Sequence, residues 1–430
     1  MKVFYLLILS LFTFTLNAQT GQAPITSPAP LSQQPANNPP GCVTDLLHNL
    51  KKANNPAYAQ QQQLMDNAIR NFAGTQRGGT ITIPVVVHII HNNGEENISD
   101  QQVLDGLFHL NLAFANISPY NTSNGVNTGI QFCLAQQDPN GEYTFGITRT
   151  VSTLTNMNAE SEDLQLKNLI RWDPTRYLNI WLVKEITTFS MGSGVAGYAY
   201  FPSSHGQPED GIVNEASLFG SSVNNSKVHI HEAGHYLGLY HTFEGGCTNN
   251  NCQTDGDRVC DTPPDNSTNP VLCAENPNTC SSDDDDLSPN NPFRPVANGG
   301  LGDQPDMFEN YMDYGFQFCQ NAFSQGQSTR MNSALNTSRA SLLQSIGCNS
   351  ICYSPINTIY TTSATTILYG GSVTFTVTYP ANGITYTWAV NGVPFGTGTT
   401  VSRTFNNVGT YTITLTADNG QPACLGYRNI

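Results

Sequence analysis

The pattern of hydrophobic and polar positions divides the chain into stretches of different character. Residues 42–77 show weak helical periodicity and too few apolar positions for a core of their own. Between residues 81 and 241, apolar β-branched runs alternate with helical periodicity, which indicates a mixed α/β unit. Beyond about residue 349, apolar and polar residues alternate with a period of two, which indicates an all-β module.

The α/β unit begins with ITIPVVVHII, residues 81–90, a continuous apolar run typical of a buried strand. A helix is expected over residues 96–116, where Ser99 and Gln102 form a capping box and apolar residues recur every three to four positions. Further strands are expected before a helix that carries a histidine cluster; they lie at residues 129–135, 177–183, 196–202 and 210–215.

The all-β module contains SVTFTVTY, ITYTWAV and TYTITLTA, in which apolar and polar residues alternate strictly. Asn391-Gly392 predicts a hairpin turn after the second of these segments. The alternation predicts an immunoglobulin-like β-sandwich of roughly eighty residues. Its expected inward-facing residues are Tyr386, Trp388, Val390, Tyr411, Ile413 and Leu415.

The first eighteen residues have the pattern of a secretory signal peptide. Lys2 precedes an apolar stretch, Val3–Leu16, and Ala18 gives a plausible cleavage site. The apolar stretch is short for a membrane span and no later segment qualifies, so we expect a secreted protein without one. Residues 19–41 are rich in Pro, Gln and Ser and should form an unstructured lead.

Charge and cysteine content narrow the class of protein. A formal net charge of -15 argues against nucleic acid as a partner, because nucleic-acid binding requires a basic face. The chain has 11 cysteines, which in an oxidising compartment are expected to form disulfides and to leave at least one thiol over. Cys42 lies alone in the N-terminal region, so it is a candidate for that thiol.

The chemistry is concentrated in HEAGHYLGLYH, residues 231–241. His231 and His235 are four residues apart and therefore share one face of a helix, and Gly238 can end the helix so that His241 completes a three-nitrogen site. Three protein ligands leave a position open for water, which is typical of catalytic zinc. Glu232 is placed to contact that water. The alternative is a helix whose polar residues simply face solvent. The spacing HExxHxxGxxH disfavours it, because this spacing matches a known zinc-binding pattern that a solvent-facing helix does not need.

The same pattern requires a downstream turn that carries a methionine beneath the metal. ENYMDYGFQFC, residues 309–319, supplies one. Met312 would form an apolar floor, and the Tyr314 hydroxyl could reach a developing oxyanion.

These motifs resemble those of the pappalysin-like metzincin zinc metalloproteases, in particular their bacterial cytophagalysin branch. The resemblance covers residues 80–348 and rests on IPVVVHII, HEAGHYLGLYHTFEGGC, GDRVCDTPPD, NYMDY and FSQGQSTRM. It implies an α/β (α+β) catalytic domain with a mixed twisted sheet and an active-site helix. It also implies zinc on the three histidines, with Glu232 as general base, Met312 in the Met-turn and Tyr314 as transition-state stabiliser. The C-terminal module is similar to PKD domains through YTW, NG and GTYTITLTA.

The expected function is that of a secreted zinc endopeptidase made as a zymogen, in which Glu232 takes a proton from zinc-activated water that attacks a peptide bond. The expected organisation is a signal peptide at 1–18, a propeptide with a disordered Pro/Gln-rich start at 19–77, a catalytic domain at 78–348 and the β-sandwich at 349–430. Its partners would be protein or peptide substrates; what the β-module binds is open. The alternative is a secreted binding or adhesion protein with a structural metal site, against which Glu232 argues because such a site needs no general base.

Calcium is a second expected ion. TDGDRVCDTPPD, residues 254–265, offers several carboxylates among backbone carbonyls, which are the hard oxygens that calcium prefers. The resemblance suggests calcium on Asp257, the Val259 carbonyl, Asp261 and Thr262, and a solvated acidic loop is the alternative. The resemblance also favours a disulfide between Cys280 and Cys319, and the other pairings stay open.

Latency and specificity complete the sequence-based expectations. A Cys42 thiolate could fill the open zinc position, and Asp45 is the alternative ligand; cleavage near Arg77, or at Arg70, would release it. Several relatives prefer Arg or Lys directly after the scissile bond, because of an acidic residue before the cysteine that follows the Met-turn. Phe318 stands in that place here, so we expect a neutral or apolar specificity pocket.

Overall fold

The structure is a computed structural model that describes residues 41–73, 79–266, 273, 275–281, 283, 285–349, 358–378, 380, 384–418 and 426–429. The described residues fall into two compact units, one within residues 41–349 and one within residues 358–429. The predicted signal peptide and the cleavage candidate Arg77 lie outside the described residues.

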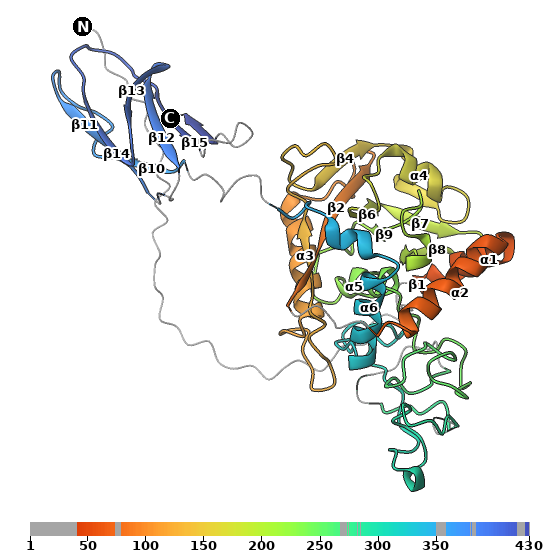
Figure 1. The fold of residues 1–430 in the computed structure, drawn as a ribbon. Helices are drawn as coiled ribbons and strands as arrows, with labels where there is room; N and C mark the ends of the chain where they lie inside the picture. Colours follow the sequence, from red (N-terminus) through yellow and green to blue (C-terminus); the bar gives the residue numbers. More distant parts are fainter. Residues whose placement is uncertain are drawn as a thin grey trace, which may run out of the picture. The chain divides into compact units, whose positions relative to one another are not determined.

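A mixed sheet forms the framework of the larger unit (Figure 1), with the strand order β3-β2-β6-β9-β8-β7-β5. Its strands are β2 (Ile81–His91), β3 (Ile130–Leu134), β4 (Ile147–Val151), β5 (Asn156–Asn158), β6 (Leu178–Val183), β7 (Glu185–Thr188), β8 (Gly192–Ala199) and β9 (Ile212–Glu215). Strands β3, β4 and β6 run parallel to β2, which explains why the apolar run of β2 is continuous. Strand β8 runs antiparallel to β7 and to β9.

Helices cover both faces of this sheet. One face packs against α3 (Asp100–Phe114), α5 (Lys227–Tyr236) and α6 (Gln325–Asn336), whose apolar side chains join those of β2 and β6 in one cluster. The other face receives Leu166 from α4 (Asp163–Leu169) and Leu47 from α1 (Thr44–Asn54). Short 3-10 helices are η1 (Thr153–Thr155), η2 (Pro202–Ser204), η3 (Val296–Asn298) and η4 (Ala340–Gln344). The architecture confirms the predicted α/β class.

Two of these elements correct the sequence-based expectations in detail. Ser99 accepts a hydrogen bond from the Gln102 backbone, but the Gln102 side chain donates to the carbonyls of Ala216 and Phe219. The start of α3 is therefore a simple N-cap rather than a capping box, because the Gln102 side chain makes these tertiary contacts instead of bonding to the Ser99 backbone. The strand expected at residues 196–202 begins earlier, at Gly192, and ends at Ala199.

The N-terminal segment has no core of its own and uses that of the larger unit. Strand β1 (Gly41–Cys42) pairs in parallel with β8, and α2 (Pro56–Arg70) packs Met65 and Ile69 against Ala334 of α6. The sparse apolar positions of residues 42–70 thus pack against the rest of the unit.

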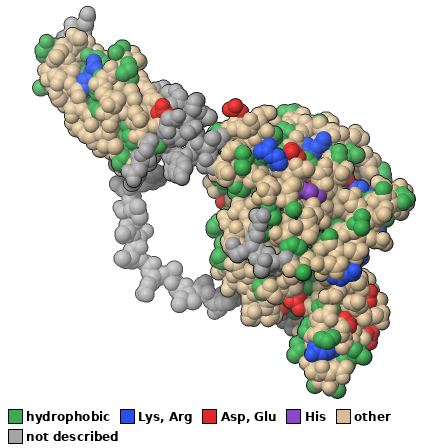
Figure 2. All heavy atoms as spheres, viewed as in Figure 1, with side chains coloured by type: hydrophobic (Ala, Val, Ile, Leu, Met, Phe, Trp, Pro, Cys, Tyr) green, Lys and Arg blue, Asp and Glu red, His purple; other side chains and the backbone are tan. Residues whose placement is uncertain are grey.

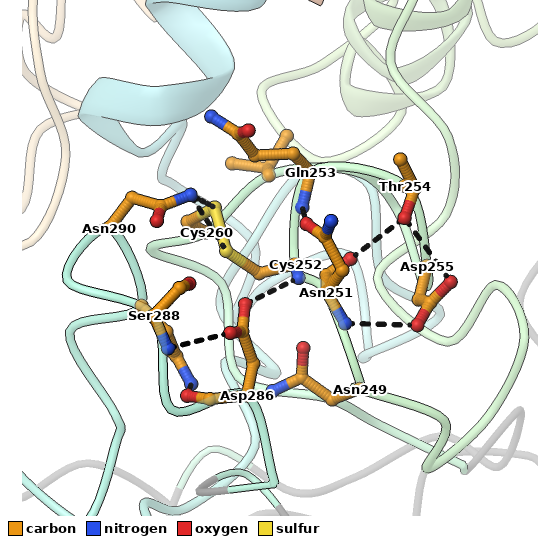
Figure 3. The surroundings of a disulfide bond; sticks show 12 residues. Asn249, Asn251, Cys252, Gln253, Thr254, Asp255, Cys260, Asp286, Ser288 and Asn290 are labelled. Atoms are coloured by element: carbon orange, nitrogen blue, oxygen red, sulfur yellow. Dashed lines mark hydrogen bonds between the residues drawn. A yellow bond between two sulfur atoms is a disulfide. The ribbon is translucent and has the colours of Figure 1, made fainter.

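Between α5 and α6 the chain runs mostly as loops tied by disulfides. The pairs are Cys247–Cys280, Cys252–Cys260 and Cys273–Cys319, while Cys133–Cys348 lies elsewhere in the unit. In Figure 3, Asp286 accepts hydrogen bonds from the backbone N–H groups of Cys252 and Ser288 beside one of these bonds. Figure 2 shows that acidic side chains gather over this loop region.

The predicted Cys280–Cys319 disulfide is wrong. A disulfide requires Cα atoms roughly 4.4–6.8 Å apart. The Cα of Cys280 lies 5.2 Å from that of Cys247, and the Cα of Cys319 lies 5.3 Å from that of Cys273. Among the cysteines that the structure describes, Cys42 is the free thiol.

The smaller unit is the predicted antiparallel sandwich. One sheet contains β10 (Tyr360–Thr362), β11 (Ser372–Val377) and β14 (Thr400–Thr404), and the other contains β12 (Thr385–Val390), β13 (Val393–Thr397), β15 (Ile413–Asp418) and β16 (Gly426–Asn429). The predicted inward-facing residues are buried except Tyr411, which is only partly buried. Asn391 and Gly392 have φ values of 50° and 81°, as a type I′ hairpin turn requires.

None of the helices in the described part of the chain combines the length and apolar character needed to cross a membrane.

Candidate active site

The three predicted histidine ligands converge on one point. His231 and His235 lie on α5, and Gly238, with φ of 95°, turns the chain so that His241 returns to them. Their Nε2 atoms lie 3.0 Å (His231 to His235) and 3.1 Å (His241 to each of the others) apart. Zinc–nitrogen bonds of about 2.0–2.1 Å in a tetrahedron place ligand atoms roughly 3.3 Å apart. The donor set therefore fits zinc.

Each imidazole is held from behind through Nδ1. His231 Nδ1 lies 2.6 Å from the Tyr311 carbonyl, and His235 Nδ1 lies 2.8 Å from the Leu239 carbonyl. His241 Nδ1 lies 2.6 Å from Asp45 Oδ2. An acceptor at Nδ1 fixes the proton there and leaves the Nε2 lone pair for a metal. Burial also lowers the pKa of His231 to about 3, so its ring is neutral and able to bind one.

Glu232 follows the first ligand on α5, and one of its carboxylate oxygens contacts the N-terminal segment. Its Oε2 accepts a hydrogen bond from Thr44 Oγ1 at 3.2 Å and lies 3.6 Å from Cys42 Sγ, which donates to it. Burial raises the pKa of Glu232 to about 8. Such a pKa suits a group that must both take up and release a proton near neutral pH.

Met312 packs against α5, and Tyr314 lies beside the histidine cluster. Met312 is buried beneath α5, and a Cβ on Gly234 would overlap its sulfur, so glycine permits the close approach of helix and turn. The Tyr314 ring lies beside His241, with ring centroids 4.9 Å apart, and its hydroxyl donates to the Cys42 carbonyl at 3.1 Å.

Cys42 is the fourth member of the cluster. Among the described residues, it forms with the three histidines the group of potential ligands whose donor atoms all lie within 4.8 Å of one another. Of the two latency alternatives, the thiol faces the cluster. The Asp45 carboxylate lies behind His241 instead.

Three of the four calcium candidates come together. Asp257 is buried, and its Oδ1 accepts from the Val259 N–H at 3.0 Å. Thr262 Oγ1 lies 2.7 Å from Asp257 Oδ2 and 2.9 Å from the Val259 carbonyl. Burial raises the pKa of Asp257 to about 7. The Asp261 carboxylate instead accepts from Ser324 Oγ and the Gly326 N–H at the start of α6.

Phe318, the candidate for the specificity pocket, lies outside the cavity beside Glu232. This side chain is 42% exposed and stacks on Phe316, and it does not line the cavity beside Glu232. The neighbouring Gln317 and Gln320 line it instead.

Two residues of the site were missed from the sequence. Thr44 holds Glu232 across 188 positions of the chain, and nothing in the local pattern signals it. Lys227 lines the cavity beside Glu232. Its signal was available, because a residue four positions before His231 lies on the same face of the helix.

Comparisons with known proteins agree with this geometry. A sequence profile of the pregnancy-associated plasma protein-A family (peptidase family M43) matches residues 160–336, and a PKD domain profile matches residues 358–423. An extracellular metalloprotease of Colletotrichum graminicola is 30% identical over 281 residues, which cover 62% of this chain and 80% of that protein. One of Sordaria macrospora is 31% identical over 245 residues, which cover 54% and 74%.

A solved structure is similar as well. A mutant of Tannerella forsythia promirolysin superposes with a TM-score of 0.54 at 29% identity, covering 70% of this chain and 97% of that one. Family, fold and the three-histidine cluster thus lead to the same identification. The chain belongs to the pregnancy-associated plasma protein-A family of extracellular metalloproteases, as a zinc metalloendopeptidase with a C-terminal PKD domain.

Proposed function

We propose that this protein is a secreted zymogen whose residues 41–70 close the active site, and that the mature enzyme cleaves peptide bonds with Glu232 as general base. The observation that carries the proposal is the position of Cys42 Sγ, which completes the three-histidine cluster from an N-terminal segment. The similarity to a structure described as a promirolysin supports the same reading.

The N-terminal segment blocks the site in three ways. The Cys42 sulfur takes the position that a catalytic zinc site keeps open for water. Thr44 and Cys42 engage the Glu232 carboxylate, which a general base must have free. Strand β1 pairs in parallel with β8. It therefore covers an edge of β8 to which an extended substrate could otherwise add as a strand.

Removal of this segment would free each group for catalysis. Zinc held by His231, His235 and His241 supplies Lewis-acid chemistry, which lowers the pKa of a water molecule and polarises a peptide carbonyl. Glu232 takes the proton of the attacking water and delivers it to the leaving amine. Tyr314, released from the Cys42 carbonyl, can donate its hydroxyl proton to the developing oxyanion.

We further propose a calcium site on Asp257, the Val259 carbonyl and the Thr262 hydroxyl. Their oxygens converge, and a carboxylate buried without a cation would be costly. The Asp261 carboxylate is left out, because the first turn of α6 already engages it. We also propose residues 1–18 as the signal peptide and cleavage near Arg77, with exposed Arg70 at the end of α2 as the second candidate.

The test compares the chain of residues 19–430 with its Glu232→Gln variant, which keeps the shape of the side chain but not its basicity. Both are trimmed at the N-terminus by an added protease, repurified and analysed for zinc content and for hydrolysis of a fluorogenic peptide. We expect equal zinc content and a loss of activity of about 10²–10⁴-fold in the variant. Equal activity of the two proteins, or an inactive trimmed wild type, would contradict the proposal.

A further inference from the structure

A narrow cavity of about 30 Å³ adjoins His231 and Glu232, and Cys42 of the N-terminal segment forms part of its lining. The first turn of α5 forms one wall, through Lys227 and Val228. The segment that follows Met312 forms the other wall, through Tyr314, Gln317 and Gln320. Because Glu232 would deliver a proton to the leaving amine, the side chain of the residue that bears that amine would enter here once the N-terminal segment, and with it Cys42, has left.

Lys227 gives this cavity an unbalanced positive charge. The residue is only 4% exposed, but its amino nitrogen is not among the fully enclosed atoms, and within the described residues no ion pair involves it. The other deeply buried lysine of the unit, Lys167, has the carboxylate of Asp163 and the carbonyl of Glu209 as partners. A lysine whose stem is buried and whose amino group opens into a cavity is placed to pair with an anion that enters that cavity.

The one acidic side chain in the cavity wall besides Glu232 does not neutralise Lys227. Asp313 accepts hydrogen bonds from Thr242 Oγ1 at 2.7 Å and from the Gly315 N–H at 3.0 Å. Burial and the nearby Asp265 carboxylate raise the pKa of Asp313 well above its ordinary value. Burial lowers the pKa of Lys227 only to about 8, so it remains mostly charged at neutral pH. The positive end of the α5 dipole adds to the same potential.

We propose that Lys227 makes the enzyme prefer aspartate or glutamate as the residue directly after the scissile bond. The proposal rests on the peptidase function proposed above and names its substrate class. It replaces the expectation of a neutral or apolar pocket, because the side chain that determines the charge of the cavity comes from α5 rather than from position 318.

The test uses two peptides that differ only by Glu or Gln directly after the cleaved bond, and a third with Lys in that place. The matured full chain is compared with Lys227→Met and Lys227→Glu, and with Lys184→Met, an exposed lysine, as control. We expect the wild type and the control to favour Glu over Gln by about tenfold or more in kcat/KM, as a desolvated ion pair allows. Lys227→Met should reduce the ratio to within about twofold, and Lys227→Glu should favour the Lys peptide.

The ratio of kcat/KM for two peptides, measured on one enzyme preparation, is unaffected by partial misfolding of a variant. An active wild type with equal rates on the Glu and Gln peptides, or a Lys227→Met variant that keeps the preference, overturns this inference alone. A matured wild type that cleaves none of the three peptides and no general protein substrate overturns the proposed function together with it.

Discussion

His241 differs from the other two zinc ligands in what supports it. His231 and His235 rest on carbonyls of the catalytic unit, whereas His241 Nδ1 faces Asp45 of the N-terminal segment. Removal of that segment therefore takes away Cys42 and also the partner that orients one ligand. At the scale of residues, latency and ligand support come from the same five-residue stretch of chain, 41–45.

Replacement of Cys42 tests the latency switch. Cys42→Ser exchanges a soft thiolate for a hydroxyl that binds zinc poorly, so the uncleaved chain should lose part of its latency. We expect its activity on a small fluorogenic peptide to exceed that of uncleaved wild type by about tenfold or more, a difference of about 1.4 kcal/mol. Intact mass recorded on the same sample shows whether the segment is still attached. Equal latency of the two uncleaved proteins would rule out the switch.

The buried Asp257 carboxyl gives a pH-dependent test of the calcium site. Burial raises its pKa to about 7, so its contribution to stability is fully present below the ordinary Asp pKa of about 3.9 and is lost as pH rises through about 7. Without calcium, and with zinc present, we expect the Tm to fall by about 2–5 °C between pH 5 and pH 8. Added calcium should remove this fall, and Asp257→Asn should abolish the effect of calcium. Asp285→Asn, on an exposed loop position, serves as control. A calcium response that survives in Asp257→Asn would place the ion elsewhere.

The histidine cluster could be predicted because metal chemistry fixes a local spacing on a helix and its following turn. Thr44 and the disulfide partner of Cys280 could not, because each depends on which distant segments the fold brings together. Phe318 shows a third case. The local pattern proposed Phe318 for a specificity pocket, but the cavity beside Glu232 is lined by Gln317 and Gln320, and Phe318 stacks on Phe316.

At the scale of elements, α2 fastens the N-terminal segment to the catalytic unit. Asp66 pairs with Arg330 at 2.6 Å and also with Arg258, and Tyr240 donates to the same carboxylate at 3.0 Å. Burial raises the pKa of Asp66, but the two guanidinium groups outweigh it and hold the pKa below its ordinary value. The predicted helical periodicity of residues 42–77 did not indicate these contacts of Asp66, since the partners lie more than 170 positions away along the chain.

Asp66→Asn should weaken the attachment of the N-terminal segment, because it removes the ion pairs of Asp66. Removal of one partner from a buried ion pair costs about 3–5 kcal/mol, so the cleaved segment should dissociate faster and activity should appear sooner. Because the pKa of Asp66 is lowered in the folded state, the stability that its ion pairs contribute is fully present above about pH 3.9. This stability is lost only as pH falls further. Size-exclusion chromatography of nicked protein measures how much segment is retained. Gln63→Ala, exposed on the same helix, is the control. Equal retention in the two variants would show that Asp66 does not hold the segment.

Elements whose sequence has a strong hydrophobic periodicity were predictable. Elements that form by packing on another segment of the chain were not. Strands β2, β6 and β9 lie close to where the apolar runs place them, and α5 ends where Gly238 allows it to. Strand β8 begins several residues before its apolar pattern, because its glycine-rich start is paired with β7 rather than buried by its own side chains. Helices α1 and α2 form on a surface that the later chain provides.

At the scale of the whole molecule, each unit has its own core. The clusters of the larger unit contain no side chain from residues 358–429, and the sandwich is closed around Trp388 by its own strands. We therefore expect a chain that ends at Asn349 to keep kcat/KM on small peptides within about twofold of the full matured chain, and to lose no more than about 0.5 kcal/mol of stability. Peptide kinetics and thermal melting of the two proteins measure this. A loss of tenfold or more would mean that the PKD domain contributes to the site itself.

The most direct test of the account is zinc-edge X-ray absorption of the uncleaved chain and of the same protein after its N-terminal segment has been removed. We expect the uncleaved chain to show three nitrogen neighbours at about 2.0–2.1 Å and one sulfur at about 2.3 Å. After removal, the sulfur shell should vanish and a nitrogen or oxygen shell remain. Absence of sulfur from the uncleaved chain, or a sulfur shell that persists in the active enzyme, would contradict a zinc site closed by Cys42.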